Sequence, residues 1–127
     1  MDTYKTHGAF SWSELMTTDP QAAADFYARL FGWKVETMDM GTGPYRVVKA
    51  GDTSVGGIMG MPPGEQAPPS AWGCYVTVDN VDETVRQCTA LGGKVCVGPM
   101  DIPTVGRFAV LQDPQGAVIN VITYAAA

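Results

Sequence analysis

Basic residues are scarce in this sequence, and that scarcity excludes one class of partner. Lysine and arginine together number eight among 127 residues, against thirteen aspartates and glutamates, so the formal net charge is −5. The eight basic residues are scattered along the chain. Nucleic-acid binding depends on clustered basic side chains that neutralise phosphates. We therefore expect no nucleic-acid partner.

Long hydrophobic runs and paired cysteines are also missing. No segment approaches the roughly 20 apolar residues that a membrane-spanning helix needs, and the first seven residues show no signal-peptide pattern. The three cysteines, Cys74, Cys88 and Cys96, are odd in number and lack CxxC spacing. They predict reduced thiols rather than disulfides or a metal site. The sequence thus predicts a cytoplasmic protein without membrane contact.

Several common catalytic patterns are absent as well. The chain has no P-loop, no GxGxxG after a strand and no GxSxG elbow. Its one histidine, His7, lies in a terminus that we expect to be loose. These absences argue against nucleotide binding and serine-type hydrolysis, and nothing in the sequence calls for a cofactor.

The chain does contain an internal repeat. Asp19 and Asn80 each begin a helical pattern with a side-chain oxygen that can accept the first free N–H groups, and glycine follows each pattern. Adding 61 to the residue numbers of the first pattern superposes it on the second, with Leu30 on Leu91. Further matched pairs are Gly32 with Gly93, Arg46 with Arg107, Asp52 with Asp113, and the segment 57–59 with 118–120.

Each copy predicts a strand, a helix and three further strands, so the fold class is α+β with two tandem βαβββ modules. We expect a single domain over residues 1–127, with modules at 8–61 and 72–124 joined by a proline-rich linker at 62–71. The predicted helices are 20–31 and 81–91; the predicted strands are 9–16, 33–38, 45–50, 53–61, 72–78, 94–97, 107–112 and 117–124.

Three phrases carry a resemblance to a known family: Asp25–Tyr27, Leu30–Trp33 and Asp113–Ala117. In this order and spacing the chain resembles the vicinal oxygen chelate superfamily of glyoxalase I, extradiol dioxygenases and bleomycin-resistance proteins, and its short bacterial glyoxalase-like members in particular. The resemblance covers roughly Gly8 to Tyr124. It implies the glyoxalase/bleomycin-resistance-like fold, with cup-shaped mixed sheets that enclose a small-molecule cavity, and homodimers that often exchange modules.

The same resemblance implies where a metal would bind. In metal-dependent members, His, Gln or Glu ligands come from the first and last strands of each module. The matching positions here are Trp12, Met59, Gly73 and Asn120. A tryptophan N–H, a thioether, a glycine and one neutral amide are poor ligands for a hard divalent ion. We therefore predict that no metal binds there.

Strand alternation predicts the lining of the cup instead. If Trp12 faces inward, so does Glu14, while Tyr75 takes the matching place in the second module. A register error of one residue would point Trp72 inward and Tyr75 outward. The predicted ligand-binding residues are Trp12, Glu14, Met59, Tyr75 and Asn120. This lining is mostly apolar and aromatic, as is typical of small-molecule sites.

Glu14 is the candidate for catalysis. Burial among apolar neighbours would raise its pKa, so it could serve as a general acid or base, or as the counter-ion of a cationic ligand. The alternative is a structural pairing with Arg46, Arg107 or a backbone N–H. Arg107 in turn could clamp an anionic ligand, although its repeat partner Arg46 favours a structural role for both.

Three functions are compatible with the sequence. The leading hypothesis is metal-free binding or sequestration of a small molecule. The second is an enzyme of the same superfamily, a lyase, isomerase or dioxygenase-like protein, that uses Glu14 as acid or base or holds a metal through unusual ligands. The third is an interaction module that acts in assembly. The fold resemblance alone does not decide among them.

Overall fold

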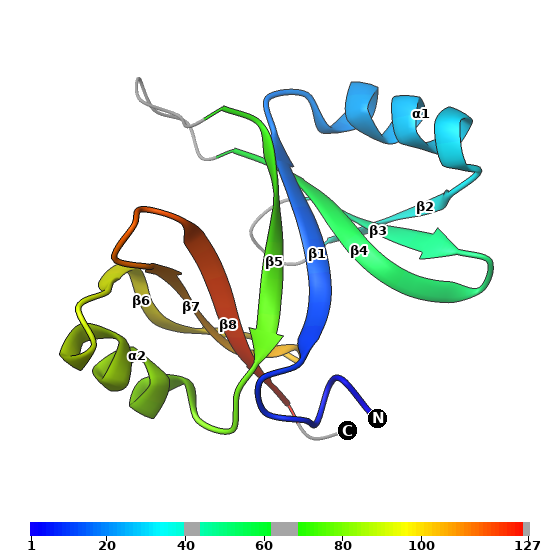
Figure 1. The fold of residues 1–127 in the computed structure, drawn as a ribbon. Helices are drawn as coiled ribbons and strands as arrows, with labels where there is room; N and C mark the ends of the chain where they lie inside the picture. The colour runs from blue at the N-terminus through cyan, green and yellow to red at the C-terminus, as the bar shows by residue number, and fades with distance from the viewer. Residues whose placement is uncertain (40–43, 62–68, 126–127) are drawn as a thin grey trace. The chain divides into compact units, whose positions relative to one another are not determined.

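The computed structural model describes residues 1–39, 44–61 and 69–125. Most of the predicted linker at 62–71 lies outside the described residues. The chain divides into two compact units, one of Trp12–Gly73 and one that combines Met1–Ser11 with Cys74–Ala127. Each unit holds most of one copy of the repeat (Figure 1). The predicted α+β class is confirmed.

In the first module, one helix covers one face of a four-stranded sheet. Its elements are β1 (Phe10–Thr17), α1 (Pro20–Phe31), β2 (Lys34–Asp39), β3 (Pro44–Ala50) and β4 (Thr53–Gly60). The strands run in the order β2-β3-β4-β1, antiparallel except for the parallel pair β1 and β4. The α1 helix packs on the sheet through Ala24, which joins a buried cluster with Leu15, Val48 and Ile58.

The second module repeats this plan. Its elements are β5 (Ala71–Thr77), α2 (Val81–Ala90), β6 (Lys94–Ile102), β7 (Gly106–Gln112) and β8 (Val118–Tyr124). The strand order is β5-β8-β7-β6, with β5 and β8 parallel. Helix α2 covers the sheet over a buried cluster of Val78, Val81, Ala109, Leu111 and Val121. Neither α1 nor α2, the helices of the described part of the chain, is long and apolar enough to cross a membrane.

Both helices begin as the repeat predicts. The Asp19 side chain accepts a hydrogen bond from the Ala22 N–H at 3.0 Å, and the Asn80 side chain accepts one from the Glu83 N–H at 3.0 Å. Such caps satisfy backbone donors that have no partner inside the helix. Donors and acceptors alike are 61 residues apart, so the offset describes the helices correctly.

The offset is wrong for the last strand of each module. Strand pairing places Gly57 beside Glu14 and Asn120 beside Tyr75, so the structural counterpart of Asn120 is Gly57 rather than Met59. The strand before it is shifted equally, because Val47 pairs with Gly57 and Val110 pairs with Asn120 at the same separation along the chain. The extra residues of the second module therefore lie earlier, where β6 carries bulges after Val95 and Val97 and β2 carries none.

Two other expectations are corrected. Strand β6 runs to Ile102 instead of ending at Val97, because β-bulges after Val95 and Val97 carry the pairing past Gly98 and Pro99. The residues before β1 are not loose but pack on the second module. There the His7 Nδ1 atom accepts a hydrogen bond from the Asp79 N–H at 2.9 Å, and the ring of Tyr4 meets that of Tyr124 edge-on at 5.0 Å.

Candidate functional site

The face of the first sheet that points away from α1 carries the residues expected to bind a ligand. Leu15 belongs to the cluster under α1, so its neighbours Glu14 and Met16 lie on the opposite face, as does Trp12. The pairing of Glu14 with Gly57 and of Met16 with Met59 extends this open face across β4. The burial of Leu15 under α1 therefore agrees with the predicted register of β1, in which Trp12 and Glu14 share the opposite face.

Three polar groups meet on that open face. The Tyr45 hydroxyl donates a hydrogen bond to Glu14 Oε2 at 2.7 Å and accepts one from Trp12 Nε1 at 3.0 Å. All three side chains are partly buried. The hydroxyl thus joins a carboxylate to an indole N–H and fixes the orientation of both. A hydrogen bond to a carboxylate is stronger than one between neutral groups, so this arrangement holds the Glu14 oxygen in place.

Gly57 makes room for this contact. A Cβ atom at position 57 would overlap the hydroxyl and ring of Tyr45, whose phenol crosses β4 where glycine leaves no side chain. Gly57 pairs with both Glu14 and Val47, so it lies between the strand of the carboxylate and the strand of the tyrosine. Glycine in a strand interior often marks such a close approach. The fold therefore tolerates Tyr45 in this position because of Gly57.

Tyr45 was missed in the sequence. The sequence did contain a signal for it. Tyr45 lies near the start of β3, and Val48 of the same strand belongs to the core under α1. Residues three positions apart on a strand point to opposite faces, so Tyr45 points away from that core. Alternation alone would have placed Tyr45 on the same face as Glu14. What the sequence lacked was the pairing of β3 with β4, which sets Tyr45 close to Gly57.

The open face of the second module carries Tyr75 and Asn120. Tyr75 is buried, and its strand neighbour Val76 packs toward α2, which places Tyr75 on the open face. Asn120 pairs beside Tyr75, and its amide donates to the Cys74 carbonyl at 3.3 Å. Trp72 has the same strand parity as Val76 and so lies on the other face from Tyr75; its indole N–H donates to the hydroxyl of Tyr27 of α1 at 3.1 Å. The structure thus agrees with Tyr75, and not Trp72, on the open face.

The positions implied for a metal do not fit one. The Trp12 N–H is a donor and is bound to Tyr45, and the Asn120 amide nitrogen is bound to a carbonyl. The position equivalent to Asn120 in the first module is Gly57 rather than Met59, and glycine has no side chain that could bind a metal. Over the described ranges, no group of three or more His, Cys, Asp and Glu side chains could hold a metal ion. Hard divalent ions need several converging oxygen or imidazole ligands.

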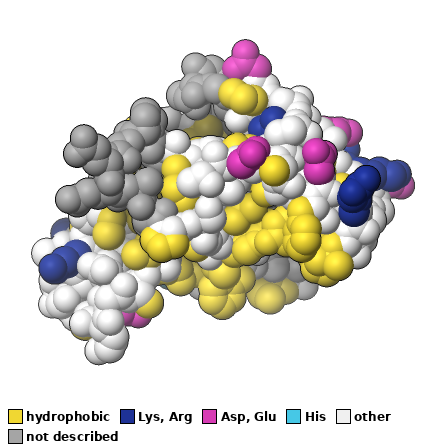
Figure 2. All heavy atoms as spheres, turned by 90° about the horizontal axis from the view of Figure 1, so that it is seen from above, with side chains coloured by type: hydrophobic (Ala, Val, Ile, Leu, Met, Phe, Trp, Pro, Cys, Tyr) yellow, Lys and Arg dark blue, Asp and Glu magenta, His cyan; other side chains and the backbone are white. Residues whose placement is uncertain are grey.

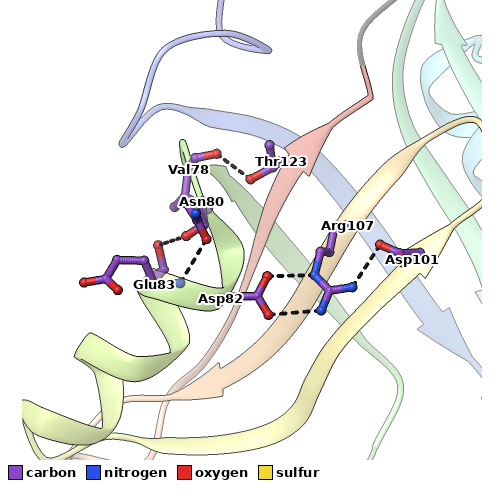
Figure 3. Close-up of polar contacts among 8 residues, drawn as sticks. Val78, Asn80, Asp82, Glu83, Asp101, Arg107 and Thr123 are labelled. Carbon is purple, nitrogen blue, oxygen red and sulfur yellow. Dashed lines mark hydrogen bonds and ion pairs between the residues drawn. The ribbon is translucent and has the colours of Figure 1, made fainter.

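Both arginines of the repeat lie on the helix side, away from Glu14. Arg107 donates two hydrogen bonds to Asp82 of α2, at 2.9 and 3.0 Å, and a third to Asp101 at 3.0 Å (Figure 3). Arg46 donates to Gln21 of α1 at 3.2 Å. Each arginine therefore ties its sheet to its helix, and the structural role favoured from the repeat is confirmed.

The Arg107 pairing has an electrostatic consequence. The hydrogen bonds that the Arg107 guanidinium donates to Asp82 and Asp101 raise the pKa of the guanidinium above its usual value, and the bond to Asp82 lowers the pKa of that carboxyl group. With its donors taken by two carboxylates, Arg107 is a poor clamp for an anionic ligand.

Two hollows occur on the helix sides of the modules. One, of about 530 Å³, lies beside the start of α2 and is lined by Asp82, Asp101 and Arg107 among others. The other, of about 370 Å³, lies between α1 and the strands, where Tyr27 and Trp72 line it. Neither contains Glu14 or Tyr45, so these hollows and the polar group on the open face are separate features of the molecule.

Comparison with known proteins decides the family. The sequence profile of the Glyoxalase/Bleomycin resistance protein/Dioxygenase superfamily matches residues 9–121. The chain belongs to this superfamily. CFP32 of Mycobacterium tuberculosis, a glyoxylase by name, is 46% identical over 91% of this chain and 44% of its own length. The anthracycline biosynthesis protein DnrV of Streptomyces peucetius is 32% identical over 90% of this chain and 46% of its own.

The chain thus spans about half the length of these relatives. A glyoxylase-like domain-containing protein of Didymella fabae, 31% identical, is matched over 87% of this chain and 89% of its own length. Among solved structures, the fold resembles methylmalonyl-CoA epimerase of Mycobacterium tuberculosis, with a TM-score of 0.66 at 12% identity over 94% of this chain and 89% of that one. The protein BH1468 of Bacillus halodurans gives a TM-score of 0.69 at 12% identity over 96% and 98%. These structures support the fold alone.

Proposed function

We propose that this superfamily member binds a small organic molecule on the open face of its first module, without a metal ion. The observation that carries the proposal is the Tyr45 hydroxyl bound to both Glu14 and Trp12. A carboxylate held beside an indole and a phenol, among methionines, combines one charged group with an adaptable apolar lining. Tyr75 and Asn120 are the corresponding candidates on the second module.

The chemistry of this group suggests the ligand class. A carboxylate attracts a positive charge, and the faces of tryptophan and tyrosine attract organic cations. Phosphates and carboxylates would be repelled by Glu14, and the arginines that could offset that repulsion are bound elsewhere. The ligand we propose has an apolar or aromatic body and a cationic group. Binding without turnover would sequester such a compound.

The second candidate is catalysis with Glu14 as general acid or base. Its support is the same hydrogen bond, because a catalytic carboxylate must be held in a fixed orientation toward the proton that it transfers. The names of CFP32 and DnrV, a glyoxylase and an antibiotic biosynthesis protein, are compatible with either candidate. An enzyme would convert the ligand, whereas a binding protein would return it unchanged.

A cytoplasmic setting and a single domain made of two modules complete the proposal. The three cysteines are all free thiols, as expected for a reducing compartment. The superfamily profile, over residues 9–121, covers most of both modules at 8–61 and 72–124, which supports this division.

The test compares an organic cation with a neutral analogue. Isothermal titration with benzyltrimethylammonium and with benzyl alcohol should show saturable binding of the cation and binding at least about tenfold weaker for the alcohol. Glu14→Gln should weaken cation binding about tenfold or more, and Tyr45→Phe by a smaller factor. Arg46→Met, on the other face of the same sheet, is the matched control and should bind as the natural protein does.

The result decides between the candidates. Recovery of the cation unchanged after prolonged incubation supports binding, whereas a converted product lost with Glu14→Gln supports catalysis. Equal affinity for the cation in the natural protein and in Glu14→Gln contradicts both. Metal analysis of the purified protein is a separate check, because a stoichiometric divalent ion would contradict the metal-free proposal.

A further inference from the structure

The hydrogen bonds among Trp12, Tyr45 and Glu14 have a fixed direction. An indole N–H can only donate, so the Tyr45 oxygen is the acceptor of the 3.0 Å bond from Trp12 Nε1. The hydrogen of the Tyr45 hydroxyl then points to Glu14 Oε2, at 2.7 Å. The bonds therefore run from the indole through the phenol to the carboxylate, which is the final acceptor.

The polar hydrogens of these three side chains are used within the group. Trp12 has a single one and donates it to Tyr45, Tyr45 has a single one and donates it to Glu14, and an ionised carboxylate has none. The group therefore meets a ligand only as a hydrogen-bond acceptor, through the oxygens of Glu14 and Tyr45. Any further contact that these oxygens make is also an accepted bond, so it does not change this character.

The side chains on the β4 side of Glu14 add no donor to the described part of this face. Glu14 pairs with Gly57, which has no side chain. Met16 pairs with Met59, and a thioether is at most a weak acceptor. A ligand that carries only acceptors would therefore find no hydrogen to bind at this place.

We propose that the cationic group of the ligand carries N–H donors, as in a protonated amine or amidine, and is not a quaternary ammonium ion. This inference rests on the proposed function and narrows its ligand class. An N⁺–H···O⁻ bond brings the nitrogen to about 2.7–2.9 Å from a carboxylate oxygen. A quaternary ion has the same charge, but its methyl groups keep the nitrogen further away and it has no hydrogen to donate.

Other attractions treat the two kinds of cation alike. The faces of the Trp12 and Tyr45 rings attract both. The net charge of −5 also attracts both, since it acts at long range. Figure 2 shows acidic side chains standing apart from one another among apolar and uncharged atoms on one face of the molecule. A difference in affinity between the two cations therefore reports the accepting oxygens of the open face.

The second module has no such acceptor group. Strand pairing puts Tyr75 in the place of Glu14 and Phe108 in the place of Tyr45, so the carboxylate and the hydroxyl next to it are both replaced. Asn120, beside Tyr75, carries a donor of its own, which it gives to a backbone carbonyl. The preference for N–H cations is thus assigned to the first module.

A series of benzyl cations tests the inference by isothermal titration near neutral pH, where the amines are protonated. Benzylamine, N-methylbenzylamine, N,N-dimethylbenzylamine and benzyltrimethylammonium share one ring and one charge, and each step removes an N–H donor until none is left. Each added methyl group makes the ligand more apolar, so burial alone would raise the affinity along the series. We expect the affinity to fall instead, by about tenfold from the dimethylamine to the quaternary ion.

Glu14→Gln tests whether the carboxylate sets this order, since glutamine keeps the shape, loses the charge and adds a donor. The drop at the last methyl group should disappear in this variant. Glu36→Gln is the matched control. Glu36 lies on the same face of the sheet, because its neighbour Val35 packs against the cluster under α1, and it accepts a hydrogen bond from Lys49 Nζ at 2.9 Å. It should keep the order of the natural protein.

The order of affinities separates this inference from the proposed function. A quaternary ion that binds as tightly as the dimethylamine, or more tightly, overturns the inference and leaves the proposed function standing. No binding of any of the four cations contradicts both. The order in the natural protein is a test on its own, whatever the stability of the variants. An order unchanged in Glu14→Gln, or lost equally in Glu36→Gln, also overturns the inference, because the Glu14 carboxylate would then not be its source.

Discussion

The two modules share a backbone plan but differ in what they add to it. In each module a side chain caps the start of the helix, Asp19 in the first and Asn80 in the second, and these two residues are 61 positions apart. Both modules also bury apolar residues under the helix. The first module adds the Trp12–Tyr45–Glu14 group on its open face and an exposed aromatic cluster around Phe26 and Phe31 on its helix side. Strand pairing makes Gly73, Phe108 and Tyr75 the counterparts of these three residues, so the second module has neither the indole, nor a hydroxyl in the place of Tyr45, nor the carboxylate.

This difference distinguishes residues that serve the shared βαβββ plan from residues that only one module has. Leu15, Ala24 and Val48 belong to the shared plan, because their counterparts also pack under α2. Glu14 and the Tyr45 hydroxyl occur in the first module alone, so the βαβββ plan itself does not call for them.

The largest expected effect on stability comes from replacing a strand glycine of the first module by alanine, compared with the same change in the second module. Gly57→Ala would drive the Tyr45 ring away from Gly57, which breaks its hydrogen bonds to Glu14 and Trp12 and should cost about 2 kcal/mol of unfolding free energy. Gly98→Ala in β6 meets no atom within 4 Å and should change stability by less than about 0.5 kcal/mol. Urea denaturation measures both. An equal loss of unfolding free energy in Gly57→Ala and Gly98→Ala would mean that the hydrogen bonds of Tyr45 contribute nothing to stability.

A smaller effect concerns the pH dependence of stability, to which the contacts of Arg107 should contribute and those of Arg46 should not. The pKa of Asp82 is lowered by its hydrogen bond with Arg107, so the folded state favours the charged carboxylate. This contribution is present above the unfolded pKa of about 3.9 and is lost as the pH falls through the lower folded value. Stability should therefore fall less steeply on acidification in Asp82→Asn than in the natural protein.

The first module supplies the control for that pH dependence. Arg46 is bound to Gln21, which does not titrate, so Arg46→Met should leave the acid slope of stability unchanged. Thermal melts between about pH 5 and pH 2 give the slopes. Identical slopes in Asp82→Asn and the natural protein would contradict the role assigned to the pair.

The smallest effect concerns a turn. Thr104, between β6 and β7, has a φ of 66°, in the left-handed region that threonine seldom adopts. Thr104→Asn should raise stability by about 0.5 kcal/mol, since asparagine tolerates this conformation. Thr53→Asn, at an exposed strand position, should not. A destabilised Thr104→Asn would show that the threonine side chain has another role.

Local patterns in the sequence predicted most of the fold and only part of the site. Caps, turns and apolar spacing depend on residues a few positions apart, so α1 and its end at Phe31 could be read directly. The site depends on pairing between strands that are far apart in sequence. The register that makes Gly57, and not Met59, the counterpart of Asn120 follows from the bulges of β6, which the sequence does not reveal. Tyr45 could be recognised only once β3 and β4 were paired.

The central claim is that the open face of the first module, at Trp12, Tyr45 and Glu14, binds the ligand. The chain has three tryptophans, so an ¹H–¹⁵N spectrum contains three indole N–H signals. Trp12 donates to Tyr45 on the open face, whereas Trp33 and Trp72 contact each other on the helix side at 6.0 Å. Titration with benzyltrimethylammonium should shift the Trp12 signal and leave the other two in place. Shifts of Trp33 or Trp72 with an unmoved Trp12 would contradict the account.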